Sequence, residues 1–293
     1  MKYGIQIIVN DFNTIFKKSI LEIFKNGEWT NPRGFLCNEI IAPQIILTDP
    51  KNCLVTLKNR KLNYAYLIVE KMMYLSQVCY PEILMAYNAK MKDFLNQETD
   101  NFDGAYGPRI AKGEQLKYCY EQLKSDKDSR QAVVTINDFT DRRVSLDKPC
   151  TLSLQFLIRK GKLDLIVTMR SNDILWGLCL DVPAFCFLQE VMAFWLGIPV
   201  GNYIHTAASF HYYKEFEERL ISFVDDNELN DEEIPEWDVK YEDMLGALLK
   251  FWREEKHIRE EMHYKNTGYK VIDKYLERLY DYWLHKKIKL ENV

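Results

Sequence analysis

The sequence predicts an α/β fold in which helices pack against a β-sheet, followed by a helical appendage. Residues 152–158 and 163–169 alternate apolar and polar side chains with a period of two, as strands with one buried face do. Residues 62–78 and 182–196 are apolar on most of their circumference, which is typical of helices buried in a core. With 293 residues, 47% of them hydrophobic, the chain is long enough to bury a sizeable core.

The remaining elements follow from the same periodicities and from turn residues. Lys160-Gly161-Lys162 stands between the two alternating stretches, which indicates a hairpin. The other expected elements are a strand at 2–9, a helix at 12–24 closed by Asn26-Gly27, a helix at 115–123 and a strand at 132–136. An acidic stretch at 225–236 precedes two charged, aromatic-rich helical segments. The expected division is therefore a main domain at 1–224 and an acidic linker with a helical extension at 225–293.

Composition and charge narrow the class of function. A net charge of −4 and a pI near 5.8 provide no cationic face for duplex nucleic acid, although a few local arginines are enough for small phosphorylated ligands. The seven cysteines form no CxxC pair and no apolar leader precedes them, which predicts free thiols in a reducing cytoplasm, that of the host if the source is viral. No metal site is expected. No stretch nears the roughly 18 uninterrupted apolar residues of a membrane span, so a soluble protein is expected.

Four places in the sequence carry residues suited to chemistry. Cys150 stands at a strand edge before the hairpin, although a free cysteine is more often a small buried hydrophobe. Glu70 lies in the middle of an apolar helix, where an unpaired carboxylate is costly or takes up a proton. Arg170 follows the second strand and His211 lies near a strand end, and in isolation each is as readily an ordinary surface or hydrogen-bonded residue. No single place decides the function.

Together these residues resemble the thymidylate synthase family in type and in spacing. The matching segments are Arg33, Glu70, Tyr106-Gly107, Asp128-Ser129-Arg130, Pro149-Cys150 with Gln155-Phe156, Arg170-Ser171-x-Asp173 with Gly177, and His211-x-Tyr213. The resemblance covers about residues 30–215 and implies a mixed sheet covered by helices. It also implies a homodimer that forms through a sheet face, with 1–224 as the catalytic domain.

The resemblance implies a role for each matching residue. Cys150, its thiolate favoured by nearby arginine charge, would add to C6 of a pyrimidine and activate C5, while Glu70 carries protons through water. The implied substrate-binding residues are Arg33, Arg170 and Ser171 at the 5′-phosphate, Arg130 at the phosphate site of the opposite subunit, His211 and Tyr213 at the ribose, and Gln155. Asp173 and Gly177 would face the cosubstrate, 5,10-methylenetetrahydrofolate.

Departures from the family pattern indicate the base. Asp181 stands where thymidylate synthases carry the asparagine of Leu-Gly-x-Pro-Phe-Asn, and Thr151 replaces the histidine after the nucleophile. An asparagine suits N3–H and O4 of uracil, whereas an aspartate only accepts and suits the amino group and a protonated N3 of cytosine. The aspartate therefore points to the phage-type deoxycytidylate hydroxymethylases of this family, which hydrate the methylene intermediate instead of reducing it.

Three further features bear on the site. Gln131 replaces a second arginine of the phosphate loop. Lys92 falls where thymidylate synthases have a tryptophan against folate and base, which is compatible with water near the methylene carbon. Strict alternation puts Cys150 and Gln155 on opposite faces of one strand, so a bulge is expected if both serve one pocket.

The sequence thus predicts one-carbon transfer from methylenetetrahydrofolate to C5 of deoxycytidine monophosphate (dCMP), followed by addition of water, as in the supply of a modified nucleotide for DNA. The first alternative is a thymidylate synthase that acts on deoxyuridine monophosphate (dUMP), in which Asp181 is neutral drift. The others are a hydroxymethylase of cytidine monophosphate and a catalytically inactive nucleotide- or RNA-binding protein on this fold. No residue is identified that would read the 2′ position of the sugar.

Overall fold

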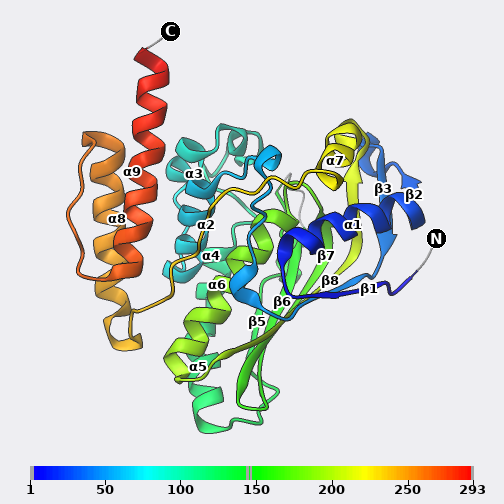
Figure 1. Ribbon diagram of the computed structural model, residues 1–293. Coiled ribbons are helices and arrows are strands. Elements are labelled where there is room, and N and C mark those ends of the chain that lie inside the picture. The colour runs from blue at the N-terminus through cyan, green and yellow to red at the C-terminus, as the bar shows by residue number, and fades with distance from the viewer. Residues whose placement is uncertain (1–2, 143–144, 146, 292–293) are drawn as a thin grey trace.

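The computed structural model describes residues 3–142, 145 and 147–291 (Figure 1). Its helices are α1 (Phe12–Asn26), α2 (Tyr64–Ser76), α3 (Pro81–Tyr87), α4 (Tyr106–Ala111), α5 (Gln115–Ser125), α6 (Leu178–Leu196), α7 (Glu217–Val224), α8 (Met244–Glu261) and α9 (Lys270–Glu291). Its strands are β1 (Gln6–Val9), β2 (Glu28–Thr30), β3 (Cys37–Ile41), β4 (Gln44–Leu47), β5 (Val133–Thr135), β6 (Thr151–Arg159), β7 (Lys162–Asp173) and β8 (Val200–Tyr213).

The described strands form one mixed sheet, as predicted. Its order is β1-β4-β8-β7-β6-β5, and β3 pairs with both β8 and β2. β7 runs parallel to β8 and β1 runs parallel to β4, while the other described pairs are antiparallel. The parallel pairing places the C-terminal ends of the two longest strands, β7 and β8, side by side.

The predicted hairpin is formed by β6 and β7. Arg159 pairs with Lys162, so Lys160 and Gly161 are the two turn residues. Their φ angles are 52° and 72°. Two successive residues with positive φ make the turn that matches the twist of the flanking strands. β7 continues to Asp173, beyond the predicted end at residue 169, into polar residues that no longer alternate with apolar ones.

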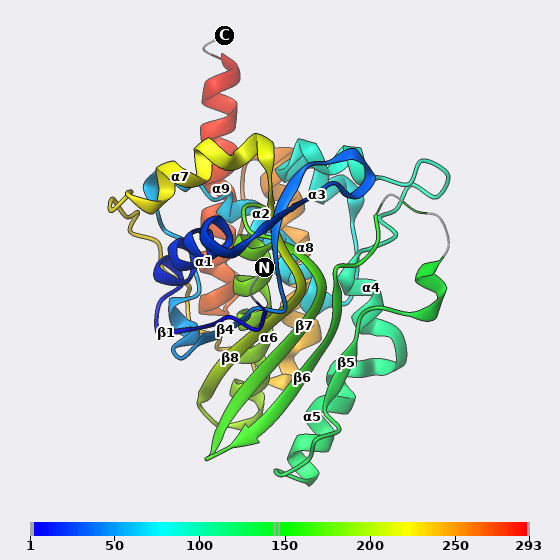
Figure 2. The same ribbon diagram turned by 90° about the vertical axis from the view of Figure 1, so that its right-hand side faces the viewer.

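Helices cover one face of the sheet. On β6, Leu154, Phe156 and Ile158 are buried in the core, and α6 packs against β7 and β8. The residues that alternate with them on β6 are only half-buried. Figure 2 shows β5, β6 and β7 in front of α6, with no described helix over them in that view. This second face of the sheet is therefore open.

Helix α6 is the central core helix. Most of its residues are buried, and Gly197, with φ 67°, ends it in the left-handed conformation that favours glycine. With a mean hydropathy of 1.4 it is long and apolar enough for a membrane span, yet 72% of that window is buried inside the protein. Such burial is typical of the core helix of a globular domain. Its first turn carries Asp181.

The two predicted C-terminal helices are α8 and α9, which form a hairpin beside α2 (Figure 1). The indole N–H of Trp252 donates to Ser76 Oγ at 2.8 Å. Lys71 Nζ donates to the Tyr275 hydroxyl at 2.9 Å and lies 4.0 Å from the centroid of that ring. The extension is thus docked on α2 by polar and cation–π contacts as well as by apolar packing.

The other predicted elements are present with shifted ends. The helices expected at 12–24, 62–78, 115–123 and 182–196 are α1, α2, α5 and α6, and the strands expected at 2–9 and 132–136 are β1 and β5. Residue 2 lies outside the described part. The prediction missed β3 and β4, because strands of four or five residues offer too few alternations to be recognised.

Candidate active site

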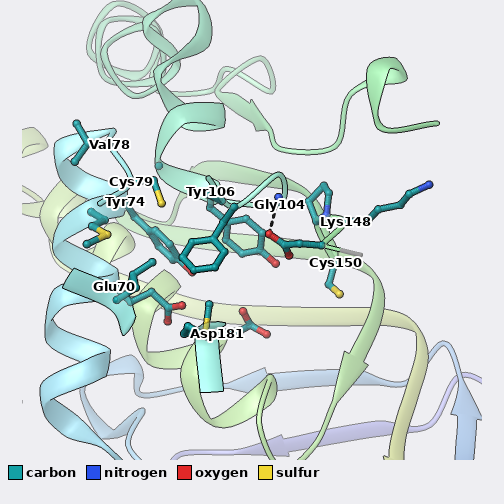
Figure 3. A pocket seen from close by; sticks show the side chains of 17 residues that line it. Glu70, Tyr74, Val78, Cys79, Gly104, Tyr106, Lys148, Cys150 and Asp181 are labelled. Atoms are coloured by element: carbon teal, nitrogen blue, oxygen red, sulfur yellow. Dashed lines mark hydrogen bonds between the residues drawn. The ribbon is translucent and has the colours of Figure 1, made fainter. Parts of the chain in front are cut away.

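One cavity of about 190 Å³ brings together segments that are far apart in the sequence. Helix α2 contributes Glu70, the first turn of α6 contributes Asp181, α4 contributes Tyr106, and the segment before β6 contributes Cys150. Figure 3 shows these side chains around the same hollow. Three residues proposed from the sequence, Glu70, Cys150 and Asp181, therefore line one cavity.

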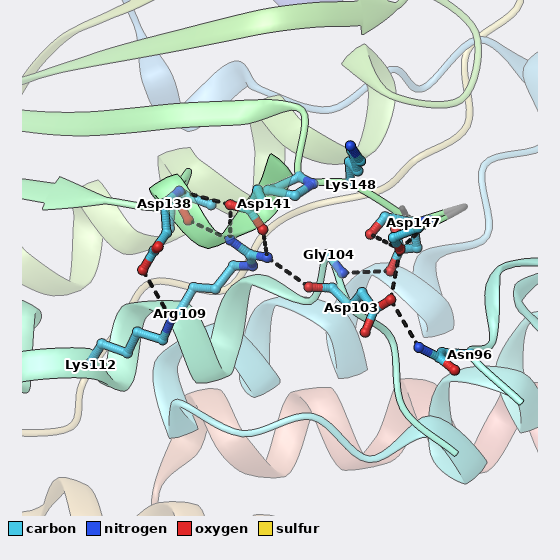
Figure 4. Close-up of polar contacts among 12 residues, drawn as sticks. Asn96, Asp103, Gly104, Arg109, Lys112, Asp138, Asp141, Asp147 and Lys148 are labelled. Carbon is cyan, nitrogen blue, oxygen red and sulfur yellow. Dashed lines mark hydrogen bonds and ion pairs between the residues drawn. The ribbon is translucent and has the colours of Figure 1, made fainter. Parts of the chain in front are cut away.

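The cavity wall next to α4 is held by Arg109, which is only 8% exposed. Its guanidinium donates to the Asp103 carbonyl at 2.7 Å and to the Asp141 carboxylate at 2.7 Å (Figure 4). Nearby, the main-chain N–H of Gly104 donates to Asp147 at 2.8 Å. These contacts tie α4 to the segment that leads to Cys150.

Arg170 of β7 is fixed against the segment that carries Cys150. Its Nε donates to the Pro149 carbonyl at 2.9 Å, and its Nη2 donates to the Lys148 carbonyl at 3.1 Å. The same Nη2 lies 3.5 Å from Cys150 Sγ. The guanidinium is therefore held beside the thiol by the main-chain carbonyls of the two residues that precede Cys150.

Opposing effects act on the Cys150 thiol. Burial raises its pKa, and the nearby Asp181 and Asp147 add to that effect. Arg170 and Arg33 lower it. Arginine charge thus acts in the predicted direction, but burial outweighs it and leaves the pKa above the usual value for cysteine.

The bulge expected between Cys150 and Gln155 is present. Thr151 pairs with Met169 but Ser153 pairs with Thr168, so the register shifts between them. Gln155 nevertheless does not line the cavity: its Nε2 donates to the carbonyl of Arg130 at 2.8 Å. The bulge changes the course of β6 next to Cys150, while Gln155 stays on the strand face that does not enter the core.

Glu70 lies one helical turn after Tyr66 on α2. The Tyr66 hydroxyl donates to Glu70 Oε1 at 2.9 Å. Burial raises the pKa of Glu70 to about 7, and the hydrogen bond from Tyr66 offsets only part of that rise. The apolar helix thus perturbs this carboxyl in the direction predicted from the sequence, into the range where it exchanges protons near neutral pH.

Asp181 is the second perturbed carboxyl of the cavity. Burial, followed by the charge of Glu70, raises its pKa to about 8. Asn172 Nδ2 donates to Asp181 Oδ2 at 2.7 Å, which lowers the pKa and offsets part of that rise. The carboxyl of Asp181 therefore exchanges its proton in the neutral to mildly alkaline range.

The ends of β7 and β8 form a polar margin that lies outside the cavity itself. Ser171 pairs with Ser209, and Asp173 pairs with His211. The rings of His211 and Tyr213 are perpendicular, with centroids 5.2 Å apart. Two buried atoms, Asp173 Oδ2 and His211 Nδ1, have no hydrogen-bond partner within the described part of the chain. Buried polar atoms without a partner are uncommon in folded proteins, so both are candidates for contact with a ligand or water.

Gly177 occupies a position where only glycine fits, at the start of α6. A Cβ there would lie 2.7 Å from Asn172 Nδ2 and 3.0 Å from the Asp173 carbonyl oxygen. The main-chain N–H of Trp176 donates to Asp173 Oδ1 at 2.5 Å. Gly177 thus permits the close approach of α6 to the end of β7.

The remaining predicted site residues are exposed on loops. Arg33 lies on a short 3₁₀-helix (Pro32–Gly34), and its charge lowers the pKa values of Cys150 and Tyr213. Arg130 is exposed beside the open face of the sheet and is absent from the cavity wall. On the 3₁₀-helix η4 (Ala89–Phe94), Met91 lines the cavity and Lys92 points to solvent. Successive residues of a 3₁₀-helix point about 120° apart, so the two cannot share one wall.

Comparison with known sequences identifies the family of this chain. The family profile described as thymidylate synthase matches residues 14–244. The chain belongs to the thymidylate synthase family. Members of this family use 5,10-methylenetetrahydrofolate as cosubstrate. The match continues past residue 224, the expected domain boundary, to the start of α8.

Several curated proteins are similar to this thymidylate synthase family member. A deoxyuridylate hydroxymethyltransferase of Bacillus phage SP01 is 34% identical over 208 residues, which are 65% of this chain and 54% of that protein. One of Delftia phage PhiW-14 is 32% identical over 197 residues, 59% of this chain and 52% of that protein. A putative thymidylate synthase of Methanocaldococcus jannaschii is 40% identical over 104 residues, 34% of this chain and 47% of that protein. The chain spans about half the length of the curated relatives it matches.

This thymidylate synthase family protein also has a cationic cluster that sequence analysis did not reveal. Lys90, Arg60 and Arg219 lie 4.6, 5.5 and 5.6 Å from the ring of Trp176. No ion pair joins these three cations to a carboxylate of the described residues. They come from three distant segments, so no local pattern could have revealed them.

In the described ranges, no group of three or more His, Cys, Asp and Glu residues is arranged to hold a metal ion.

Proposed function

We propose that this protein transfers a one-carbon unit from 5,10-methylenetetrahydrofolate to C5 of dCMP and then adds water, which yields 5-hydroxymethyl-dCMP. The observation that carries the proposal is the single cavity lined by Cys150, Glu70 and Asp181. It offers a nucleophile, a proton carrier and a group that reads the base in one place. Membership of the thymidylate synthase family supports the one-carbon transfer, and Asp181 supports cytosine as the base.

In the proposed reaction the Cys150 thiolate adds to C6 of the pyrimidine, which makes C5 nucleophilic toward the methylene carbon. Arg170 stands beside the thiol and favours its ionised form. The Nη1 group of Arg170 makes no hydrogen bond to a described residue, so it is free to bind the 5′-phosphate together with Arg33 and Ser171. A dianionic phosphate at this place would bind through the same charges that act on Cys150.

Glu70 is proposed to carry protons to and from the base and the folate. Its pKa of about 7 means that both protonation states are populated near neutral pH, as a general acid–base requires. The Tyr66 hydroxyl donates to one carboxyl oxygen at 2.9 Å, Tyr74 also hydrogen-bonds the carboxyl, and Glu70 lines the cavity. Water in the cavity would connect the carboxyl to the substrate.

Asp181 is proposed to select cytosine. When ionised, its carboxylate accepts from the N4 amino group and from a protonated N3. When neutral, its hydroxyl donates to the free N3 of cytosine, while the other oxygen accepts. Both forms therefore pair with cytosine.

A second candidate is hydroxymethylation of dUMP. The phage relatives are named deoxyuridylate hydroxymethyltransferases. The pKa of Asp181, about 8, also allows it, because a neutral carboxyl donates to O4 and accepts from N3–H as an asparagine does. The two candidates differ in pH dependence. Use of dUMP requires the neutral form, so kcat/KM for dUMP should fall as the pH rises through 8, whereas the ionised form still accepts from the amino group of dCMP.

Folate is proposed to bind beside Asp173 and Gly177, between the cavity and the cationic cluster around Trp176. Lys90 and Arg219 would attract the glutamate carboxylates of the cosubstrate. Arg60 is buried and donates to the Leu175 carbonyl, so it would add positive charge without direct contact. The unpartnered Asp173 Oδ2 is a hydrogen-bond acceptor for the pterin. Lys92 points to solvent, so it would contact the folate only after a movement of the exposed segment that carries it.

The functional unit is proposed to be a homodimer with shared sites. The open sheet face supports this, because half-buried strand residues without a covering layer are suited to packing against a second sheet. Arg130 is exposed beside that face and away from the cavity of its own chain. The positive charge of Arg130 would therefore act at the substrate cavity of the partner subunit.

Incubation with methylenetetrahydrofolate and each of dCMP, dUMP, CMP and UMP, followed by mass spectrometry of the nucleotides, tests the proposal. Hydroxymethyl-dCMP as the main product supports it, and hydroxymethyl-dUMP supports the second candidate. Formation of thymidylate together with dihydrofolate would identify a thymidylate synthase instead. No release of tritium from C5 of any nucleotide would identify a catalytically inactive protein.

A further inference from the structure

A line of buried polar side chains leads from the sheet to Asp181. The Tyr203 hydroxyl and His205 Nδ1 are 3.0 Å apart, and His205 Nε2 and Asn172 Oδ1 are 3.2 Å apart. Asn172 Nδ2 then donates to Asp181 Oδ2 at 2.7 Å. Tyr203, His205 and Asn172 are all at most 2% exposed. Only Asp181, at the end of the line, lines the cavity.

The hydrogen positions in this line follow from which groups face each other and from the neutral state of His205. The amide nitrogen of Asn172 faces a carboxylate, so its Oδ1 is the atom that faces His205 and must accept. Burial lowers the pKa of His205 to about 3, so the ring is neutral and carries one N–H. That hydrogen lies on Nε2, which leaves Nδ1 to accept from the Tyr203 hydroxyl. Every hydrogen bond of the line therefore runs in one direction, toward Asp181.

We propose that Tyr203, His205 and Asn172 act as positioning residues that hold Asp181 Oδ2 as an acceptor, so that only Oδ1 can carry the proton that donates to the pyrimidine. This inference rests on the proposed function. The orientation of the Asn172 amide and the tautomer of His205 are linked, because a turned-over amide would require the hydrogen of His205 on Nδ1 and would reverse the direction of the line. The tautomer of the neutral histidine therefore reports which end of the amide faces Asp181, and with it which oxygen of Asp181 carries a proton.

The consequence for the base is that only Oδ1 of Asp181 can donate a hydrogen bond to it. With Oδ2 occupied, a proton on neutral Asp181 resides on Oδ1, which donates to the acceptor that the base presents there. An ionised Oδ1 accepts instead. Glu70 of α2 and Asp173 of β7 are the charged groups that raise the pKa of Asp181. The charge of Asp181 in turn raises the pKa of nearby titratable groups, which are Tyr66 and Tyr74 of α2, Tyr106 of α4, Cys150 before β6, Cys179 of α6 and Tyr203 of β8.

The hydrogen positions can be tested without any activity. In protein labelled with ¹⁵N-histidine, one of the five histidines should remain neutral at pH 5 with its hydrogen on Nε2, and its signal should be missing from His205→Gln. A hydrogen on Nδ1, or a charged ring at that pH, would reverse the direction of the line and overturn the inference.

The effect on base reading is tested with a matched series. His205→Phe removes the donor to Asn172, so the amide is no longer held and the preference between dCMP and dUMP should move toward unity by about tenfold in kcat/KM. His205→Gln keeps an N–H donor and should restore most of the preference. Tyr203→Phe should produce a smaller change in the same direction. An unchanged preference in both His205→Phe and Tyr203→Phe would refute base reading through this line.

Gln189→Met is the control for burial alone. Gln189 is a fully buried amide on α6 that donates to the main chain of Leu163 and Asn202, and it makes no described hydrogen bond to a side chain of the line. Its loss should lower stability and leave the base preference unchanged. An equal change of preference in Gln189→Met would mean that the effect of His205 is merely structural.

Failure of the proposed function is distinguishable from failure of this inference. If the parent protein acts on neither nucleotide, the carboxyl pKa of Asp181 still reports the line by ¹³C NMR. The hydrogen bond from Asn172 lowers that pKa, so the pKa should rise by about one unit in His205→Phe and not in Gln189→Met. Equal values in the parent and in His205→Phe would overturn the inference whatever the substrate.

Discussion

Cys150 and Cys119 are two thiols of the same chain in different settings. Cys150 lines the cavity with Arg170 at 3.5 Å, whereas Cys119 is wholly buried in α5, where burial raises its pKa to about 12. We expect Cys150→Ala and Cys150→Ser to abolish turnover, because an alcohol is far less ionised than a thiol at neutral pH. Cys119→Ala should keep it. Tritium release from C5 measures turnover and circular dichroism checks the fold; a fully active Cys150→Ser would exclude covalent catalysis.

Asp181 decides the proposed choice of base. Asp181→Asn would supply a permanent donor to O4 of uracil and should shift the ratio of kcat/KM values toward dUMP by at least about tenfold, the value of one exchanged polar contact. The ratio is measured with both nucleotides in competition at a pH above 8, where the parent carboxyl is ionised. If the ratio is the same in parent and variant, Asp181 does not read the base.

Glu70 should make stability depend on pH. Its pKa rises from 4.5 to about 7 on folding, so the unfolded chain releases the proton first and the native state loses stability as the pH rises from 4.5 through 7. Glu70→Gln removes this loss and keeps an acceptor for Tyr66. The variant should match the parent at pH 4 and exceed it at pH 8 by up to about 3 kcal/mol.

Urea unfolding at the two pH values measures this difference. Glu98→Gln is the control, since Glu98 is exposed and makes its one described contact through its main chain. It should show no such pH dependence. A difference between Glu70→Gln and the parent that is equal at both pH values would mean that Glu70 has no raised pKa, and its proposed role in proton transfer would lose its basis.

At the scale of elements, the start of α6 and the end of β7 depend on each other. A Cβ at Gly177 would lie 2.7 Å from Asn172 Nδ2, so Gly177→Ala should displace the amide that holds Asp181 and destabilise the protein by about 1–3 kcal/mol. Gly246→Ala in α8 is the matched control, because a Cβ there meets no atom within 4 Å. It should be neutral or stabilising by up to about 1 kcal/mol. Thermal unfolding of both variants compares them, and equal stabilities would contradict the proposed close contact.

Some helices and strands could be predicted from the sequence and others could not. The helices α2 and α6 were predicted because a long stretch that is apolar on all sides is typical of a helix buried in the core. The hairpin of β6 and β7 was predicted because Lys160-Gly161 is a local turn signal. β3 and β4 were missed because their pairing with β8 is a long-range contact that their own few residues do not encode.

At the scale of the whole molecule, a shared site in a dimer predicts complementation. Cys150→Ala and Arg130→Ala should each be inactive or nearly so, and mixing them should restore activity, because a mixed dimer has one site that lost both residues and one that lost neither. Random exchange would restore up to about a quarter of the parent activity. Subunit exchange is confirmed by native mass spectrometry of one isotope-labelled partner. Confirmed exchange without recovery would show that Arg130 does not act in the opposite subunit.

By itself the sequence determined the α/β class, the main helices, the central hairpin and the identity of the residues with unusual chemistry. These are properties of composition, period and local spacing. Glu70 stood out because a carboxylate conflicts with an apolar helix, whereas Cys150 and Asp181 were named from the resemblance to the thymidylate synthase family and from a departure from its pattern. Lys92 and Gln155 showed the limit of such reasoning, because the direction of a side chain on a 3₁₀-helix or next to a bulge depends on a few degrees of backbone rotation.

Only the tertiary structure decided which of these residues share a cavity and how their charges act on each other. Burial together with the charge of Glu70 raises the pKa of Asp181 to about 8, a value that neither residue's neighbours in sequence could predict. The line from Tyr203 through His205 and Asn172, and the cations around Trp176, likewise join separate segments. Desolvation and Coulomb energy depend on distance and on the exclusion of water, and both arise only when the chain packs.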